Sequence, residues 1–291
     1  ALRECRRRGR IPPMGPVGDV RAACAGRALF EPIAHWLARF TSPGVPTQGA
    51  LDALRGEAAP DAGSGSGAPI RFVAPPVNEQ VGYEERIFAS GEVPTRNGDW
   101  HDFFNALAWC AWPRTKSACN RLHVDELRAR EAAGPPGRGP RRDALTQFDE
   151  CGIIVVSADA EITALLAAHE WEEAFWRRRA RLLASTRFLV FGHGSWDQLR
   201  APFVGLCAKA LHRVVDPGWL SRSPVQALAE TDAWLARHLT TTIGTLTPRS
   251  LAPLPLLGIP GVTPDSECAA YYRDTHQFRP KRHRGTAPAA R

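Results

Sequence analysis

Two short, unbroken apolar runs constrain the fold of this chain more than any other sequence feature. Ile153–Val156 and Phe188–Phe191 are the longest runs made only of Val, Ile, Leu and Phe, and each is far shorter than the roughly 20 apolar residues that a membrane-spanning helix needs. Unbroken runs of this length are typical of strands buried on both faces. Segments with apolar residues at helical spacing surround them. We therefore expect a helix-rich α+β domain with a small, mostly antiparallel sheet and no membrane partner.

The strands of this sheet are expected in the second half of the chain. Ala144–Asp149 and Ile153–Ser157 are both β-rich and flank Glu150-Cys151-Gly152, in which Gly152 can adopt the positive φ of a tight turn. This pattern predicts a hairpin over about 144–157. Further strands are predicted at about 187–191 and 209–215, with a short strand at Ile70–Val73 and a loop at Gly91–Gly98.

Helices are predicted where apolar residues recur at spacings of three and four. They are Ala28–Phe40, Gln48–Leu54, Tyr83–Ser90, one from Trp100 onward, Arg114–Glu131, Asp159–Ala184, Trp196–Arg200 and Pro224–Leu239. Asp61–Pro69 has the composition of a flexible linker. We expect one domain over 28–278, flanked by disordered basic tails at 1–27 and 279–291.

The positive charge of the chain is concentrated in its two ends. The formal net charge is +7, but residues 1–10 contribute +4 and residues 279–291 contribute +5, which leaves the body slightly negative. Basic tails can bind nucleic acid or other polyanions without specificity. The charge therefore predicts no specific nucleic-acid partner for the folded body.

The seven cysteines form no recognisable framework. Their number is odd, they are widely scattered, and no Cys-x-x-Cys pair is present. This pattern indicates neither a set of disulfides nor a zinc ribbon. With no apolar signal-peptide core at the start of the sequence, we expect a soluble protein in a reducing cytoplasm.

The densest group of polar and aromatic residues begins at Asp99. Asp99 is expected to cap the helix that starts at Trp100. On that helix His101, Asp102 and Asn105 can share one stripe. They could hold a divalent metal with water, or Asp102 could orient His101 as a general base. The alternative is that Asp102 only assists the cap and His101 is a satisfied, half-buried residue.

A second polar group follows Pro113. Arg114, Lys116 and Asn120 suit a phosphate or carboxylate ligand, and Lys116 is one of only three lysines in the chain. Arg141 and Arg142 could clamp an acidic group beside them. The alternatives are that Arg114 and Lys116 are simply solvated, and that Arg142 pairs with a nearby aspartate.

His193 lies in Gly192-His193-Gly194-Ser195, at the end of a predicted strand. Strand ends commonly present reactive side chains, so His193 could complete a metal or acid–base site. Ser195 is better explained as a helix N-cap. The segment lacks the Gly-x-Ser-x-Gly nucleophile elbow, and a serine hydrolase is not expected.

Several blocks in this order resemble a family of bacterial proteins, the domain-of-unknown-function family 3025. The blocks are Tyr83–Phe88, Gly91–Arg96, Trp100–Leu107, Trp112–Lys116, Arg141–Thr146, Phe148–Glu150, Phe191–His193 and Leu254–Gly261. The resemblance covers about residues 70–282. It implies a compact bacterial protein and no catalytic residues, because the family has no established activity.

Two hypotheses of function follow from these patterns. The first is a hydrolase or transferase that acts on an anionic, phosphate-bearing small molecule, with His101, Asp102 and His193 as catalytic residues. Its anion ligands would be Asn105, Arg114, Lys116, Asn120, Arg141 and Arg142. The second is a noncatalytic module whose tryptophans and cations bind an acidic partner or single-stranded nucleic acid. Exposed aromatics would favour the second hypothesis, and a common pocket would favour the first.

Overall fold

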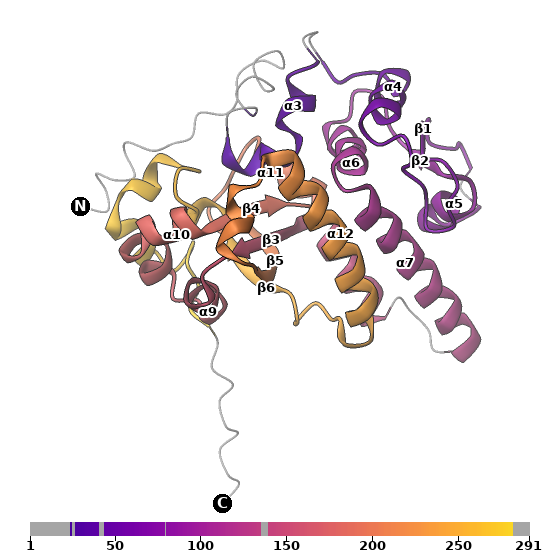
Figure 1. The fold of residues 1–291 in the computed structure, drawn as a ribbon. Coiled ribbons are helices and arrows are strands. Elements are labelled where there is room, and N and C mark those ends of the chain that lie inside the picture. The colour runs from indigo at the N-terminus through magenta and orange to yellow at the C-terminus, as the bar shows by residue number, and fades with distance from the viewer. Residues whose placement is uncertain (1–23, 25–26, 41–43, 79, 135–138, 282–291) are drawn as a thin grey trace, which may run out of the picture.

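The computed structural model describes residues 24, 27–40, 44–78, 80–134 and 139–281. A four-stranded sheet lies in the middle of the molecule (Figure 1). Its strands are β3 (Gly152–Ser157), β4 (Thr186–Val190), β5 (Cys207–Val214) and β6 (Ala252–Pro255), in the order β4-β3-β5-β6. β3 pairs antiparallel with β4 and parallel with β5, and β5 pairs antiparallel with β6. The expected α+β fold with a mostly antiparallel sheet is confirmed.

Helices surround this sheet. Figure 1 shows α9 (Ala160–Ala168) and α10 (Arg179–Ser185) on one side and α12 (Pro224–Thr242) on the other. Beyond α12 lie α4 (Gln48–Ala58), α5 (Tyr83–Ser90), α6 (Trp100–Ala111) and α7 (Pro113–Ala133). The remaining helices include α3 (Ala34–Leu37), α8 (Pro140–Cys151) and α11 (His193–Gln198).

Short helical turns fill the connections, and a small second sheet lies beside α4 and α5. The turns are η1 (Ala28–Ile33), η2 (Glu173–Arg177), η3 (Pro217–Ser221), η4 (Ile243–Thr245), η5 (Leu256–Gly258), η6 (Pro264–Glu267) and η7 (Ala269–Arg273). The second sheet joins β1 (Arg71–Val73) in parallel to β2 (Glu92–Pro94). β2 lies within the stretch predicted to be a loop. No helix in the described part of the chain is long and apolar enough to cross a bilayer.

The predicted hairpin over 144–157 is wrong. Residues 144–149 belong to α8, which begins with Pro140 at its first position, where a missing N–H costs nothing. Ala144, Leu145 and Phe148 are buried at helical spacing, so one face of the helix packs on the core. β3 follows directly at Gly152, and its antiparallel partner is the distant β4 rather than an adjacent strand.

The long helix predicted from Asp159 to Ala184 is interrupted. His169 ends α9 in the left-handed region, with φ 65°, and η2 and α10 follow as separate turns. A helix cannot continue through a left-handed residue. The side chain of Asp159 caps α9 by accepting hydrogen bonds from the amides of Glu161 and Ile162.

The predicted flexible linker at 61–69 is instead a fixed loop. Gly63 bridges Pro69, the amide of Gly65 donates to Asn120 Oδ1 at 2.9 Å, and Ser117 Oγ donates to the Ser64 carbonyl. A Cβ on Gly65 would lie 2.5 Å from the backbone of α7. Glycine therefore serves close contact between this loop and α7 rather than flexibility.

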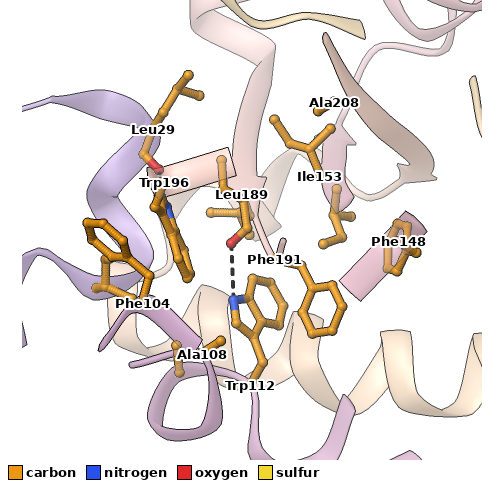
Figure 2. Packing of buried hydrophobic residues seen from close by; sticks show 14 of the residues in the cluster. Leu29, Phe104, Ala108, Trp112, Phe148, Ile153, Leu189, Phe191, Trp196 and Ala208 are labelled. Atoms are coloured by element: carbon orange, nitrogen blue, oxygen red, sulfur yellow. Dashed lines mark hydrogen bonds between the residues drawn. The ribbon is translucent and has the colours of Figure 1, made fainter. Parts of the chain in front are cut away.

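Two tryptophan side chains hydrogen-bond to backbone carbonyls and connect the helices to each other and to the sheet (Figure 2). Trp112, between α6 and α7, donates to the Val190 carbonyl at the end of β4, and its ring packs edge-on against Phe191. Trp196 on α11 donates to the Leu29 carbonyl. The buried apolar residues form one continuous cluster. These contacts fix the start of α11 relative to α6.

The two predicted tails fall largely outside the described residues. Residues 1–23, 25–26 and 282–291 are not described. The described residues 279–281 are exposed but bonded to the body, since the Arg279 carbonyl accepts a hydrogen bond from Trp171 and Lys281 donates to the Ala167 carbonyl. The body that the structure describes therefore extends at least three residues past the predicted boundary at 278.

Candidate metal centre

Three elements that are distant in the chain meet at one point. His101 lies in the first turn of α6, Glu150 in the last turn of α8 and His193 at the first position of α11. The end of α8 and the start of α11 are joined because the amides of Phe191 and Gly192 both donate to the Gly152 carbonyl at 2.9 Å. This junction places Glu150 beside His193.

The glycines on both sides of His193 permit this close approach. A Cβ on Gly192 would lie 2.4 Å from the Gly152 nitrogen, and a Cβ on Gly194 would lie 2.6 Å from Glu150 Oε2. Real Cβ atoms do not come so close to other atoms. The Gly-His-Gly sequence is thus required by contact with α8 and not by an unusual backbone conformation.

The three side chains bring one donor atom each to within 3.7 Å of the other two. His101 Nε2 lies 3.1 Å from His193 Nε2, and Glu150 Oε1 lies 3.7 Å from each of these nitrogens. A point equidistant from the corners of such a triangle lies about 2.0 Å from each corner, which is the distance at which Zn²⁺ binds imidazole nitrogen and carboxylate oxygen. Among the residues that the structure describes, this is the one group of His, Cys, Asp and Glu with metal-binding geometry.

Burial and pairing set the protonation states of the two histidines. Burial lowers the pKa of His193 to about 4, although Asp149 opposes the shift. His193 is therefore neutral near pH 7, as a metal ligand must be. The pKa of His101 is raised, chiefly by its pairing with Glu150. For Glu150, burial alone would raise the pKa, but the two histidines outweigh it and the pKa is lowered.

A buried ion pair lies behind His193. Lys116 Nζ donates to both Asp149 oxygens, at 2.7 and 2.8 Å, and to Asn105 Oδ1 at 2.9 Å. Asp149 Oδ2 lies 3.6 Å from His193 Nδ1. Burial would raise the pKa of Asp149, but the charge of Lys116 outweighs it and the pKa is lowered, which keeps the carboxylate ionised. A carboxylate at the second ring nitrogen commonly orients a metal-bound histidine.

These groups open into a cavity of about 300 Å³. Its described lining consists of Tyr83, Glu84, Pro94, Arg96, His101, Asp102, Asn105, His123, Thr146, Asp149, Glu150 and His193. Arg96 is the one Arg or Lys among them, and its guanidinium and amide make three hydrogen bonds to Asp102 of 2.7–2.9 Å. The cavity therefore offers carboxylates and hydrogen-bonding groups more than unpaired cations.

Of the two roles considered for Asp102, its contacts fit the alternative, in which it assists the helix cap. Arg96 pairs with the carboxylate and helps to keep the pKa of Asp102 low against the effect of burial, and the Asp102 amide donates to Asp99. The residue thus fixes the loop before α6 and completes its capped start. Although Asp102 lines the cavity, the carboxylate near the His101 ring nitrogen is Glu150.

The predicted anion ligands are not all brought together. Asn105 lines the cavity and Lys116 lies behind it, neutralised by Asp149. Asn120 is buried and fastens α7 to its neighbours: its amide nitrogen donates to the carbonyl and the carboxylate of Glu84, and its oxygen accepts from Gly65. Asn120 therefore has structural partners on both of its polar atoms.

The three arginines lie elsewhere. Arg114 lines a separate groove, where its amide is capped by Asp232 of α12. Arg141 pairs with Glu126 and donates to the Gly244 carbonyl. Arg141 and Arg142 lie in the first turn of α8, about 12 Å along the helix from Glu150. None of the three is among the described lining residues of the cavity.

Sequence reasoning missed Glu150, Asp149, Tyr83 and His123. Glu150 was assigned to a hairpin turn because residues 144–149 were assigned to a strand. The signal that could have identified α8 is Pro140, followed by buried apolar residues at helical spacing. A helix over these residues places Asp149 and Glu150 in its last turn, directly before β3. β3 pairs with β4, which is the strand that leads to His193.

A comparison with protein families bears on the whole site. A family described as a protein of unknown function, DUF3025, matches residues 70–282. The chain belongs to this family. The DUF3025 match includes the triangle of His101, Glu150 and His193, the ion pair behind it and every described residue of the cavity lining. No curated protein and no solved structure matches the chain.

Proposed function

We propose that this DUF3025 protein is a metal-dependent hydrolase whose divalent metal is bound by His101, Glu150 and His193. The observation that carries the proposal is the triangle of donor atoms, with a common position about 2.0 Å from each. Two histidines and one glutamate that leave a position open to a cavity are typical of catalytic zinc sites in hydrolases. The same donor set also binds Fe²⁺.

Two features outside the triangle support a metal over a simple histidine pair. His193 Nδ1 has no hydrogen-bond partner among the described residues, while its Nε2 faces the other ligands. Asp149 is close enough to accept from Nδ1 after a small adjustment. A metal on Nε2 would favour this tautomer, and a bound Lewis acid would polarise a substrate or lower the pKa of a water.

A catalytic role is better supported than a binding surface for nucleic acid. The second hypothesis required exposed aromatics, yet Trp109 is 1% exposed and Trp112 is 0% exposed. Trp100 is partly covered by Arg200, whose guanidinium lies 4.4 Å from the ring centre. Phosphate recognition also loses support, since Lys116 is already paired with Asp149.

Metal binding is the direct test. Tag-free protein is stripped with EDTA and titrated with Zn²⁺ by calorimetry. We expect one Zn²⁺ per chain, and affinity at least about 100-fold lower in His101→Ala and in His193→Ala, since even second-shell losses cost 10–100-fold. The matched control is His276→Ala, because His276 is an exposed histidine outside the cavity lining.

Hydrolysis is measured on the same samples. The zinc-loaded wild type should cleave small activated esters or phosphodiesters, and the stripped protein should not. A wild-type protein that binds no divalent metal, or variants that bind as tightly as the wild type, would contradict the proposal.

A further inference from the structure

One chain of hydrogen bonds runs from the buried ion pair to the wall of the cavity. Lys116 Nζ donates to Asn105 Oδ1, and Asn105 Nδ2 donates to the hydroxyl oxygen of Tyr83 at 3.0 Å. Lys116 and Asn105 are 5% and 6% exposed, so water does not compete for these bonds. Tyr83 lies on the cavity wall with His101, Glu150 and His193.

The direction of each bond in this chain is fixed by chemistry. An ammonium group can only donate, so the Asn105 atom that faces Lys116 must be the carbonyl oxygen. The Asn105 NH₂ group must then face Tyr83, whose oxygen accepts. The hydroxyl hydrogen of Tyr83 is consequently directed away from Asn105, and no described residue accepts it.

The hydroxyl keeps this hydrogen at neutral pH. Burial, with the charges of Glu84 and Asp149, raises the pKa of Tyr83 far above its usual value. Tyr83 as a whole is 39% exposed, while its hydroxyl oxygen meets Asn105, which is 6% exposed. Tyr83 is thus a preoriented neutral donor in the same cavity as His101, Glu150 and His193.

The charges of the cavity restrict what this donor can bind. Arg96 is engaged by Asp102, and Lys116 by Asp149. Glu84 and Glu150 remain as acids on the wall, and a divalent metal would balance them. A phosphate dianion would find no unpaired cation among the described lining residues, whereas an uncharged carbonyl group needs only one donor and the metal.

We propose that the substrate is an uncharged acyl compound, an ester or amide, and that Tyr83 donates its hydrogen bond to the acyl oxygen during hydrolysis. Water adds to the carbonyl carbon, and the C=O electron pair moves to the oxygen that Tyr83 faces. The pair on oxygen then re-forms the C=O bond as the bond from carbon to the leaving group breaks; the leaving group departs with the pair of that bond and takes a proton from the added water, which leaves a carboxylic acid. A donor placed where charge develops stabilises this step more than it stabilises the bound substrate.

This inference rests on the proposed metal site, and the experiment separates the two. Zinc-loaded wild type, Tyr83→Phe and Tyr271→Phe are compared in three measurements: Zn²⁺ affinity, hydrolysis of p-nitrophenyl acetate and of bis-p-nitrophenyl phosphate, and binding of acetohydroxamate. Tyr271 is the matched control because it is a partly buried tyrosine outside the cavity lining.

We expect Tyr83→Phe to bind Zn²⁺ like the wild type. Its ester hydrolysis should fall about 100-fold with little change in KM, as for other single oxyanion donors, and acetohydroxamate should bind about tenfold more weakly. Tyr271→Phe should match the wild type in all three measurements. A Zn²⁺-binding Tyr83→Phe with wild-type hydrolysis and hydroxamate affinity would overturn the role of Tyr83.

A second variant tests the direction of the hydrogen bonds. Asn105→Asp keeps the shape of the side chain, but both new oxygens accept, so the Tyr83 hydroxyl would turn to donate to one of them. We expect Asn105→Asp to bind acetohydroxamate as weakly as Tyr83→Phe does and to bind Zn²⁺ like the wild type. Phosphodiester cleavage without ester cleavage or hydroxamate binding would overturn the substrate class, and a wild type without Zn²⁺ binding would overturn the proposed function itself.

Discussion

Replacing Lys116 by methionine tests the buried ion pair that underlies the site. Methionine has nearly the length of lysine, so Lys116→Met removes the charge and leaves little cavity. The Asp149 carboxylate then loses both of its hydrogen bonds from Lys116, at 2.7 and 2.8 Å, and the Asn105 carbonyl loses its own. The free energy of unfolding should fall because a charge remains in the protein without its partner.

The size of the effect follows from the exposure of the two side chains. Removing one partner of a fully buried pair costs about 3–5 kcal/mol. The Lys116 side chain is 6% exposed, but that of Asp149 is 21% exposed and keeps some solvation. We therefore expect about 3 kcal/mol, which corresponds to a decrease in Tm of about 6–12 °C for a domain of this size.

The assay is thermal and urea unfolding of metal-free protein in EDTA. Lys209→Met is the matched control, since Lys209 is a partly buried lysine of β5 outside the cavity lining. Adding Asp149→Asn to Lys116→Met should restore more than half of the loss, because the unpaired charge is then gone. A decrease in Tm below about 2 °C, or a double variant less stable than the single one, would refute the reasoning.

Three further predictions concern other parts of the molecule. Gly194→Ala should lower Zn²⁺ affinity at least about tenfold in calorimetry, because its Cβ would lie 2.6 Å from Glu150 Oε2 and displace that ligand. Gly65→Ala should lower the Tm by several degrees, because its Cβ would meet the α7 backbone at 2.5 Å; an unchanged Tm would show that this loop can move away. Burial would raise the pKa of Asp159, but Arg181 outweighs it and the pKa is lowered, so this pair stabilises the protein above the unfolded pKa of about 4 and the stabilisation is lost as the pH falls through the folded pKa. Unfolding curves of the wild type and Asp159→Asn should therefore converge below about pH 4 and differ at pH 7.

The local parts of the fold could be predicted from the sequence because they depend on residues that are neighbours in the chain. The cap at Asp99 and the first turn of α6 depend on neighbouring residues, as does the strand that leads to His193. The strand predicted at residues 144–149 failed because a short apolar pattern fits both periodicities until tertiary contacts select one. Composition also predicted a flexible linker at residues 61–69. In the structure the glycine at position 65 instead allows this loop to lie close to α7.

The site itself depends on contacts that no local pattern specifies. His101 and His193 are 92 positions apart, and Lys116 and Asp149 are 33 apart. The sequence identified His101, Asn105, Lys116 and His193 as unusual, but it could not assign their partners. Arg114 and Arg141 looked equally suited to a ligand, but the structure pairs the Arg141 guanidinium with Glu126 and places Arg114 in a separate groove, where its backbone amide donates to Asp232.

The Lys116–Asp149 pair connects the two halves of the proposed mechanism. On one side Asp149 faces Nδ1 of a metal-binding histidine, and on the other Lys116 fixes the amide of Asn105 and hence the hydroxyl of Tyr83. Loss of Lys116 should therefore lower both Zn²⁺ affinity and acyl hydrolysis, whereas loss of the Tyr83 hydroxyl should lower hydrolysis alone. Hydrolysis by Lys116→Met is therefore compared with the fraction of the variant that has Zn²⁺ bound. If hydrolysis falls only in proportion to that fraction, Lys116 acts through Asp149 and His193 alone, and the hydrogen bonds through Asn105 to Tyr83 do not contribute.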